Sequence, residues 1–400
     1  MIFGFTAIEY FIIITIVFSL LFFAFSRRWS WVPISLLVVA LSVLAFYVMP
    51  NETDDLARYF ETLNYMKTGG REVLQHMKDM GWNGWNDFPV YAEYFYFISR
   101  LPSVHYLPAV TIFISYGLMY LIIYRAANRF NVSRGFLYIG CIFFLSTYWY
   151  YDTLSGIRNG LVFAVIMACL YTMLVEKRHF VWGTIGCILA ILFHSAGVIL
   201  IAIALCAVLT RRIGGRWVTP ITLTGIVFGP SILGWLSNVT DSGFMDVLAE
   251  KADRHATGGG FLMQTNFLVN VVLLIVCVLM FIYFRWYFKV DIRGKDLDLF
   301  IQFSTITAFF MFGCVTNPLI FLRLARWIVP VIMAILFMAG SQIQWDMVRG
   351  QPGKNYEFEA IPPERWRYQN KYTIFTIFCL FTAVHYYYLC AGSSLNWMHF

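Results

Sequence analysis

"LAILFHSAGVIL", residues 189–200, lies inside an apolar stretch that runs from Phe180 to Thr210. His194 is the only residue of the Asp, Glu, His, Lys and Arg types in that stretch. Basic turns flank it on both sides, "EKRH" at 176–179 and "RRIGGR" at 211–216. Whether the chain crosses a membrane once or twice between these turns sets the topology of everything downstream.

The composition indicates an integral membrane protein. Of the 400 residues, 60% are hydrophobic and 13% are charged, whereas about a quarter of the residues in a soluble domain are charged. Apolar runs of about 20 residues recur, and each is long enough to cross a ~30 Å hydrocarbon layer. We therefore predict an all-α polytopic membrane protein with a single integral membrane domain over 1–400. Outside 180–210, the expected spans are 8–26, 31–49, 106–124, 135–151, 157–175, 217–236, 263–284, 297–316, 323–340 and 372–390.

The basic residues orient these spans, because short cytoplasmic loops are enriched in Lys and Arg. One set of loops holds 19 of the 29 Lys and Arg residues, and the set expected on the opposite side holds 10. The basic set comprises 27–30, 125–134, 176–179, 211–216, 285–296 and 341–371. The two sets alternate only if 180–210 leaves and returns on the same side of the membrane.

We therefore predict a short helical hairpin at 180–210 with "HSAG" at its turn. Each arm of about 15 residues would be roughly 22 Å long, which is less than a full crossing. The prediction gives about twelve membrane segments, a cytoplasmic loop at 341–371 and both termini extracytoplasmic. His194 would lie at a backbone break that faces the outer side. Non-helical backbone at membrane depth is tolerated where it is buried in protein or lines a hydrated cavity. The alternative is a neutral core histidine bonded to a neighbouring carbonyl.

Two large extracytoplasmic loops are expected, at 50–105 and 237–262. The first contains "DLARYFETLNYM", whose spacing predicts an amphipathic helix. One face of this helix is formed by Leu56, Tyr59, Phe60 and Leu63. The many aromatic residues of the first loop suit the membrane interface and also suit stacking on sugar rings. The second loop is either a mobile lid or an inert connector.

Three arginines stand at the outer ends of predicted spans. Arg158 begins the span 157–175, and Arg323 and Arg326 begin the span 323–340. Because they are three residues apart on one helix, Arg323 and Arg326 share a face. A guanidinium group at the end of an apolar helix is costly unless it has a partner.

Three kinds of partner are considered for these arginines. Lipid headgroup phosphate is one, and neighbouring carboxylates such as Asp54, Asp55 and Asp152 are another. The third is a diphosphate, because the planar guanidinium fork matches phosphate oxygens and helix N-termini attract anions. Together the arginines predict an anion site on the same side as His194.

At these residues the chain resembles a known family. "SGIRNGLVFAVIMACLYTMLVEKRHFVWGTIGCILAILFHSAGVIL" resembles the central signature of the EpsG/Wzy-type bacterial polysaccharide polymerases. That signature has an Arg entering one span, a basic turn and an A-x-x-F-H-small motif. The matching residues are Arg158, Lys177, Arg178, Ala190, Phe193, His194 and Ser195. "DDLARYFETLNY" upstream and "FLRLARW" downstream also match in position, so the resemblance spans roughly 50–340.

The resemblance implies a GT-C-like membrane glycosyltransferase in the bacterial cytoplasmic membrane. It would polymerise undecaprenyl-diphosphate-linked oligosaccharide repeat units at the outer face, to make O-antigen (lipopolysaccharide), capsule or exopolysaccharide. The expected partners are that lipid-linked oligosaccharide and the lipid bilayer, and a chain-length regulator protein is a further candidate. No cofactor, metal or nucleic acid is expected.

A mechanism follows from this resemblance and from the residue types. The predicted substrate-binding residues are Arg158, Arg323, Arg326, Tyr59 and Asp152. The arginines would offset the charge that develops on the diphosphate as the glycosidic bond breaks. His194 would either deprotonate the acceptor hydroxyl or hydrogen-bond the phosphate, and Asp54 and Asp55 are rival bases.

Other classes of protein would use some of the same features. A transporter or flippase of lipid-linked sugars would also need a cationic groove, although no internal repeat relates the two halves of this chain. A membrane acyltransferase would need its catalytic histidine on the cytoplasmic side. A glycan ligase would use nearly the same parts as a polymerase.

Overall fold

The computed structural model describes residues 6–50, 54–80, 87–213, 298–313, 318–348 and 378–387, with residues 275, 376 and 390. Within these residues the structure is helical and contains no β-strand. The predictions for 217–236, 237–262, 263–284, 349–371 and most of 372–390 lie outside the described residues.

The helices follow one another with short connections through the first half of the chain. The first six are α1 (Ala7–Ala24), α2 (Trp31–Phe46), α3 (Asp55–Asp79), α4 (Pro89–Ser99), α5 (Tyr106–Arg129) and α6 (Arg134–Thr147). The next four are α7 (Tyr150–Ser155), α8 (Ile157–Leu170), α9 (Phe180–Phe193) and α10 (Gly197–Ile213). Toward the C-terminus lie α14 (Asp298–Gly313), α15 (Pro318–Trp327) and α16 (Val329–Val348).

Four helical segments are long and apolar enough to cross a membrane. They are Ala7–Ala24, Arg27–Phe46, Tyr106–Arg129 and Ile157–Val175, and they coincide with four of the predicted spans. Shorter apolar helices include α6, α9, α10 and parts of α14 and α16. The chain is therefore a multi-pass helical membrane protein, and the total of twelve segments stays a prediction.

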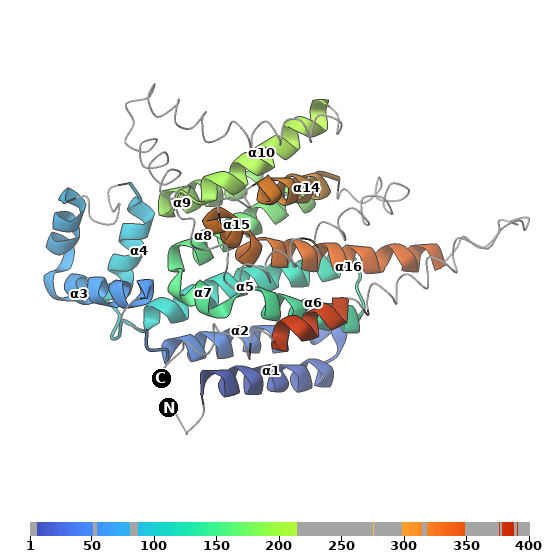
Figure 1. The fold of residues 1–400 in the computed structure, drawn as a ribbon, viewed down its shortest axis with the longest axis horizontal. Helices are drawn as coiled ribbons and strands as arrows, with labels where there is room; N and C mark the ends of the chain where they lie inside the picture. The colour runs from blue at the N-terminus through green and yellow to red at the C-terminus, as the bar shows by residue number, and fades with distance from the viewer. Residues whose placement is uncertain are drawn as a thin grey trace, which may run out of the picture.

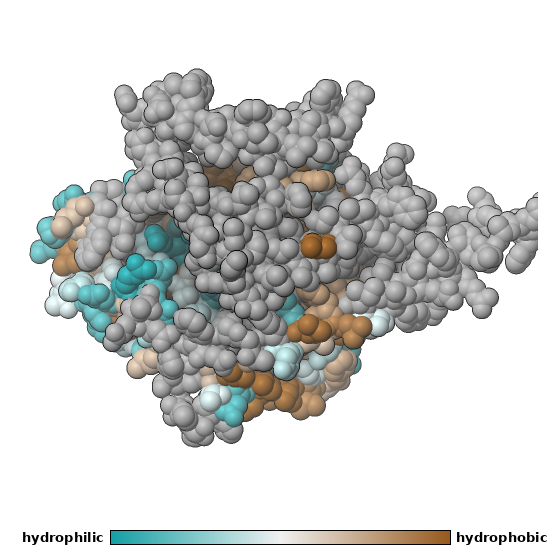
Figure 2. All heavy atoms as spheres, in the orientation of Figure 1, coloured by the Kyte–Doolittle hydropathy of each residue, from teal (hydrophilic) through white to brown (hydrophobic). Residues whose placement is uncertain are grey.

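The outward face of α1 is apolar, as expected for a helix that contacts lipid. Ile16, Leu20 and Phe23 are 53%, 68% and 54% exposed, and Figure 2 shows hydrophobic side chains over this part of the molecule. A surface helix of a soluble protein would place polar residues there. The lipid bilayer is the solvent that such a face requires.

The long helices run side by side, and α3 and α4 lie beyond one end of them (Figure 1). We call this end, with α3, α4 and α7, the α3/α4 end. In the view of Figure 1, α4 and the second half of α3 run across the direction of the long helices. Hydrophilic side chains gather over the α3/α4 end (Figure 2).

The opposite end carries the basic turns 27–30, 125–134 and 176–179, and we call it the basic end. These turns contact one another. Arg27 donates to the Val132 carbonyl at 3.1 Å and to the Asn128 side chain at 2.9 Å, and Arg125 forms an ion pair with Glu176. The three turns therefore lie together at one end, in agreement with the prediction that they share a side.

The hairpin break falls where the sequence predicts it. α9 ends at Phe193 and α10 begins at Gly197, with His194 in extended backbone between them. A Cβ on Gly197 would lie 2.6 Å from Ile166 Cδ1 of α8, so glycine allows the turn to pack closely on α8. His194 stacks on Phe88, just before α4, which places the break at the α3/α4 end.

Two predicted spans are divided in the structure. The segment 135–151 is broken at Tyr148, and the Tyr148 carbonyl accepts a hydrogen bond from the Tyr116 hydroxyl at 2.7 Å. This side-chain donor replaces the missing helical bond. The segment 323–340 is divided between α15 and α16, where Pro330 lacks an N–H to donate.

The arginine-bearing part of 323–340 is therefore a helix of its own, α15. The predicted span 323–340 is also exceeded at its C-terminal end. α16 continues to Val348, so the first residues of the predicted loop 341–371 are helical. The short α15 can be placed against α7 and α8 independently of the direction of α16. This placement decides which partners the arginines find.

Candidate anion-binding site

Arg158 stands in the first turn of α8, at the point where α3, α4 and α8 meet. Its guanidinium carbon lies 5.3 Å from the centre of the Tyr91 ring of α4. The Tyr59 hydroxyl of α3 is within hydrogen-bonding reach of the same guanidinium. Three helices thus bring one cation and two phenol rings together.

Arg323 of α15 approaches the same place from the far part of the chain. The groups that act on it electrostatically are Arg158, Asp55 and Tyr59. Among the described residues, neither Arg158 nor Arg323 forms an ion pair with a carboxylate. Two half-buried guanidinium groups near one another repel, so the arrangement favours an anion between them.

Tyr59 and Tyr91 are buried, at 6% and 0% exposure. Burial raises the pKa of both phenols, and the nearby Arg158 opposes that shift. Both rings therefore stay neutral at physiological pH. A neutral phenol keeps its O–H donor, which suits an anion better than a phenolate does.

The two candidate carboxylates at the start of α3 have different surroundings. Asp54 accepts a hydrogen bond from the Tyr151 hydroxyl of α7, which ties α3 to α7. Asp55 forms an ion pair with Arg58, and its side chain is 50% exposed. Of the two, Asp55 is the carboxylate that acts on both Tyr59 and Arg323.

His194 is buried, at 6% exposure, and its ring is held from two sides. Nδ1 accepts a hydrogen bond from the Ala196 backbone N–H at 3.0 Å, and the ring stacks on Phe88 at 5.8 Å with an interplanar angle of 15°. A neutral imidazole that accepts at Nδ1 carries its proton on Nε2. The other nitrogen of His194 is therefore a donor.

The link between His194 and Arg158 runs through α4. Tyr91 contacts the Phe193 ring at 5.5 Å, edge to face, and also lies under Arg158. Phe88, which stacks on His194, is one helical turn before Tyr91. Phe88 and Tyr91 thus connect the two parts of the site: Phe88 contacts the hairpin turn at His194, and Tyr91 contacts Arg158.

Arg326 does not join this cluster. Its Nη1 donates to Asp152 Oδ1 at 2.8 Å, and its guanidinium carbon lies 4.3 Å from the centre of the Trp149 ring. Burial raises the pKa of Asp152, and Arg326 opposes that shift. Of the three predicted arginines, the structure therefore groups two, and the third finds the carboxylate partner that the sequence left as an alternative.

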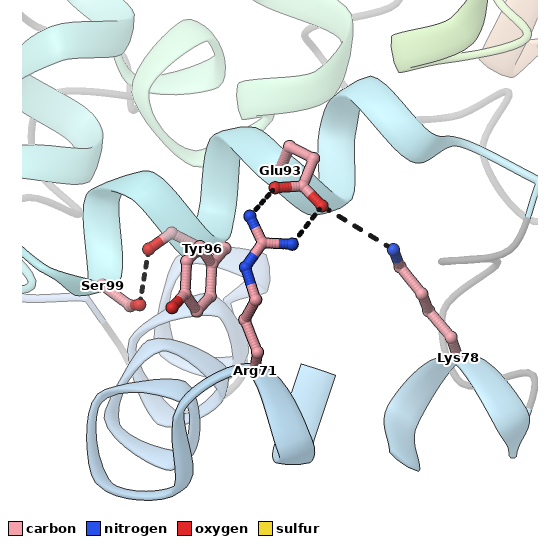
Figure 3. A network of polar contacts seen from close by, with 5 residues as sticks. All are labelled: Arg71, Lys78, Glu93, Tyr96 and Ser99. Atoms are coloured by element: carbon pink, nitrogen blue, oxygen red, sulfur yellow. Dashed lines mark hydrogen bonds and ion pairs between the residues drawn. The ribbon is translucent and has the colours of Figure 1, made fainter. Parts of the chain in front are cut away.

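Polar contacts hold α3 against α4 beyond the site (Figure 3). Arg71 reaches Glu93 at 3.1 Å and lies over the Tyr96 ring at 4.7 Å, and Lys78 lies 3.9 Å from Glu93. The chain turns just before Arg71, at Gly70, whose φ is +64°. This turn folds the second half of α3 back onto α4 and so fixes Tyr59 opposite Tyr91.

Sequence reasoning did not assign Tyr91 to the site. Tyr91 belongs to the aromatic stretch "PVYAEYFYF", where nothing local distinguishes it from Tyr94 or Tyr96. Its place beneath Arg158 results from how α4 packs on α8 and α9. Within the described part of the chain, no group of three or more His, Cys, Asp or Glu side chains is arranged to hold a metal ion.

A model of the EpsG family matches residues 35–343, which include every residue of this site. The match covers most of the chain and extends through the hairpin to α16. No curated protein and no solved structure matches the sequence.

Proposed function

The chain belongs to the EpsG family of membrane polysaccharide polymerases, and we propose that it joins undecaprenyl-diphosphate-linked oligosaccharide repeat units at the outer face of the bacterial cytoplasmic membrane. The observation that carries this proposal is the convergence of Arg158 and Arg323 on two neutral tyrosines. The donor diphosphate is the anion that this site would bind.

The charges at the site fit a diphosphate ester. Asp55 is offset by Arg58, and neither Arg158 nor Arg323 forms an ion pair with a carboxylate among the described residues, so the site keeps two positive charges. Each guanidinium presents a planar fork of N–H donors that matches phosphate oxygens. A doubly charged diphosphate diester would neutralise the pair, and Tyr59 would add an O–H donor.

The same cations would assist bond cleavage. The acceptor hydroxyl attacks the anomeric carbon of the donor sugar, and the bond from that carbon to the phosphate oxygen breaks. The diphosphate leaves with one more negative charge than it had in the donor, and Arg158 and Arg323 stabilise that charge as it develops. A single displacement of this kind inverts the anomeric centre.

Asp55 is the base that we propose for the acceptor hydroxyl. It is the more exposed of the two carboxylates, and it lies near both Tyr59 and Arg323. His194 takes the second of its two predicted roles, because its Nδ1 already accepts a backbone hydrogen bond. Its Nε2–H would donate to a phosphate or sugar oxygen.

The distribution of charge supports the outer location. The three basic turns 27–30, 125–134 and 176–179 hold Arg27, Arg125, Arg134 and further cations but one acidic residue, Glu176, as expected for loops on the cytoplasmic side. The arginine site lies at the opposite end of the helices, with α3 and α4. In this orientation α1 begins on the outer side, which is the side proposed for the N-terminus.

The test is product length from the purified protein in nanodiscs, supplied with one lipid-linked repeat unit and no other protein. The expected result is a ladder of products with increasing numbers of repeats. The same protein in sealed vesicles provides the contrast with a flippase. Movement of the lipid-linked sugar across the bilayer without any ladder would overturn the polymerase assignment.

A further inference from the structure

The ion pair between Asp152 and Arg326 lies beside the site, although neither side chain is directed to it. We propose that this pair is a clamp that holds Arg323 against Arg158, so that Asp152 and Arg326 are positioning residues and not ligands of the substrate. The clamp rests on the proposed function, because it assumes that Arg158 and Arg323 bind one anion.

A clamp is required because the two site arginines repel each other. Arg158 acts on Arg323 as an unfavourable like charge. Repulsion between such groups is stronger in a partly buried setting than in water. Asp55 offers some compensation, but it is paired with Arg58. Without substrate, something else must keep α15 in place against α8.

The last turn of α15 makes several contacts that hold the helix in place. Arg326 is paired with Asp152 and lies over Trp149. The next residue, Trp327, donates from Nε1 to Thr153 Oγ1 at 3.0 Å, and its ring stacks on Phe163 at 5.7 Å. Most of these contacts are made with α7 and the residue before it.

The short helix α7 transmits this restraint to Arg158. Only Gly156 and Ile157 separate the end of α7 from Arg158. A Cβ at Gly156 would lie 2.6 Å from the Asp152 carbonyl and 3.5 Å from Trp327 Cζ2, so α7, α8 and Trp327 approach closely at a junction that has no room for a side chain. Fixing Arg326 on α7 therefore fixes the distance between Arg323, one turn earlier on α15, and Arg158.

The pair is closed to a large substrate. The side chains of Arg326 and Asp152 are 16% and 24% exposed, and Trp149 covers one face of the guanidinium. Asp152 Oδ2 and Arg326 Nε are themselves buried. A diphosphate could pair with Arg326 only if its ion pair with Asp152 opened, whereas Arg158 and Arg323 form no ion pair with a carboxylate among the described residues.

The test compares two buried ion pairs at opposite ends of the protein. Asp152→Asn breaks the clamp with little change of shape, and Glu176→Gln breaks the Arg125–Glu176 pair at the basic end, where the Glu176 side chain is 6% exposed. The readouts are inorganic pyrophosphate binding, KM and kcat for the lipid-linked repeat unit, and the melting temperature, all in nanodiscs.

We expect Asp152→Asn to weaken pyrophosphate binding about tenfold, which corresponds to ~1.4 kcal/mol, and to raise KM by a similar factor. Glu176→Gln should lower the melting temperature at least as much while pyrophosphate binding stays unchanged. Arg326→Lys keeps the charge but loses the planar contact with Trp149. We therefore expect it to weaken pyrophosphate binding about threefold.

The outcomes separate the clamp from the proposed function. If Asp152→Asn and Arg326→Lys both bind pyrophosphate as the wild type does, while Arg158→Ala and Arg323→Ala do not, the clamp is wrong and the anion site stands. If Glu176→Gln loses as much pyrophosphate binding as Asp152→Asn, the loss is explained by general instability of the protein. That result would also overturn the clamp. Unchanged binding in the two arginine variants would overturn the anion site itself.

If Asp152→Asn fails to fold, Arg326→Lys and Trp327→Phe carry the test. Trp327→Phe removes the hydrogen bond to Thr153 and retains an aromatic ring against Phe163. A folded Trp327→Phe protein with weaker pyrophosphate binding supports the clamp, because the Trp327 N–H donates to Thr153 and is not directed to the proposed anion site.

Discussion

The two ends of the helix bundle use the same residue type in opposite ways. At the basic end three arginines bind acceptors of the protein itself: Arg125 and Arg178 share the Glu176 carboxylate, and Arg134 donates to the Phe22 carbonyl at 3.1 Å and 2.5 Å. At the α3/α4 end, Arg158 and Arg323 face tyrosines and each other. The first arrangement is complete without a ligand.

The difference indicates which arginines are structural and which are prepared for a substrate. Arg326 shows that the α3/α4 end can also supply a carboxylate, since Asp152 lies 2.8 Å from it. Among the described residues Arg158 and Arg323 form no ion pair with a carboxylate, so both guanidinium groups can pair with the charge of a ligand. Four predictions test this comparison.

The largest effect is expected from the site arginines. Arg158→Ala or Arg323→Ala should lower the rate of polymerisation by about 100-fold or more, because each removes a cation aimed at the charge of the leaving group. Arg134→Ala at the basic end is the matched control, and its rate should stay within about twofold of the wild type after correction for folded protein. Similar losses in all three variants would remove the distinction between the two ends.

His194 should give a smaller effect that depends on the replacement. His194→Ala should reduce kcat/KM by about tenfold to thirtyfold, in the range expected for a hydrogen bond to a charged group. His194→Gln supplies an N–H donor and should recover part of that loss. If His194→Gln is as inactive as His194→Ala, an N–H donor does not replace the imidazole at this position. His194 would then be the base, and the assignment of the base to Asp55 would be wrong.

Tyr59→Phe should weaken pyrophosphate binding by about threefold to tenfold, the usual cost of one neutral hydrogen bond. Because burial raises the pKa of Tyr59 above its ordinary value near 10, the wild-type phenol stays a donor as the pH rises toward that value. Wild-type binding should therefore show no tyrosine titration between about pH 8 and pH 10. A loss of binding over that range in the wild type but not in Tyr59→Phe would contradict a neutral Tyr59.

The smallest effect is expected where an ion pair is exposed. Glu93→Gln removes the partner of Arg71 and Lys78 in the contact of Figure 3, where Arg71 and Glu93 are 67% and 47% exposed. Such pairs contribute about 1 kcal/mol or less. We expect a small drop in melting temperature and an unchanged rate. A large loss of rate would mean that the second half of α3 belongs to the site.

The sequence predicted much of this fold because the decisive signals are local. Apolar runs gave the four long spans, and the basic turns that flank 180–210 predicted a break within that segment. The break at His194 and the buried face of α3, with Leu56 and Leu63, follow from periodicity and from the residues themselves. Each of these features depends on neighbours within a few turns of helix.

The choice of partners could not be read in the same way. A spacing of three residues places Arg323 and Arg326 on one helix face, but it does not tell which of them meets Arg158 and which meets Asp152. The same limit applies to Tyr91, which resembles its aromatic neighbours until α4 is packed on α9 and the Tyr91 ring meets Arg158 of α8.

The sequence by itself therefore determined that the protein is helical, spans a membrane and carries Arg158, Arg323, Arg326 and His194 toward one end. The tertiary structure decided which arginine is left without a carboxylate. The physical reason is that burying a charge is favourable or costly according to the groups around it. Those groups come from α3, α7, α8 and α15, which meet only in the folded protein.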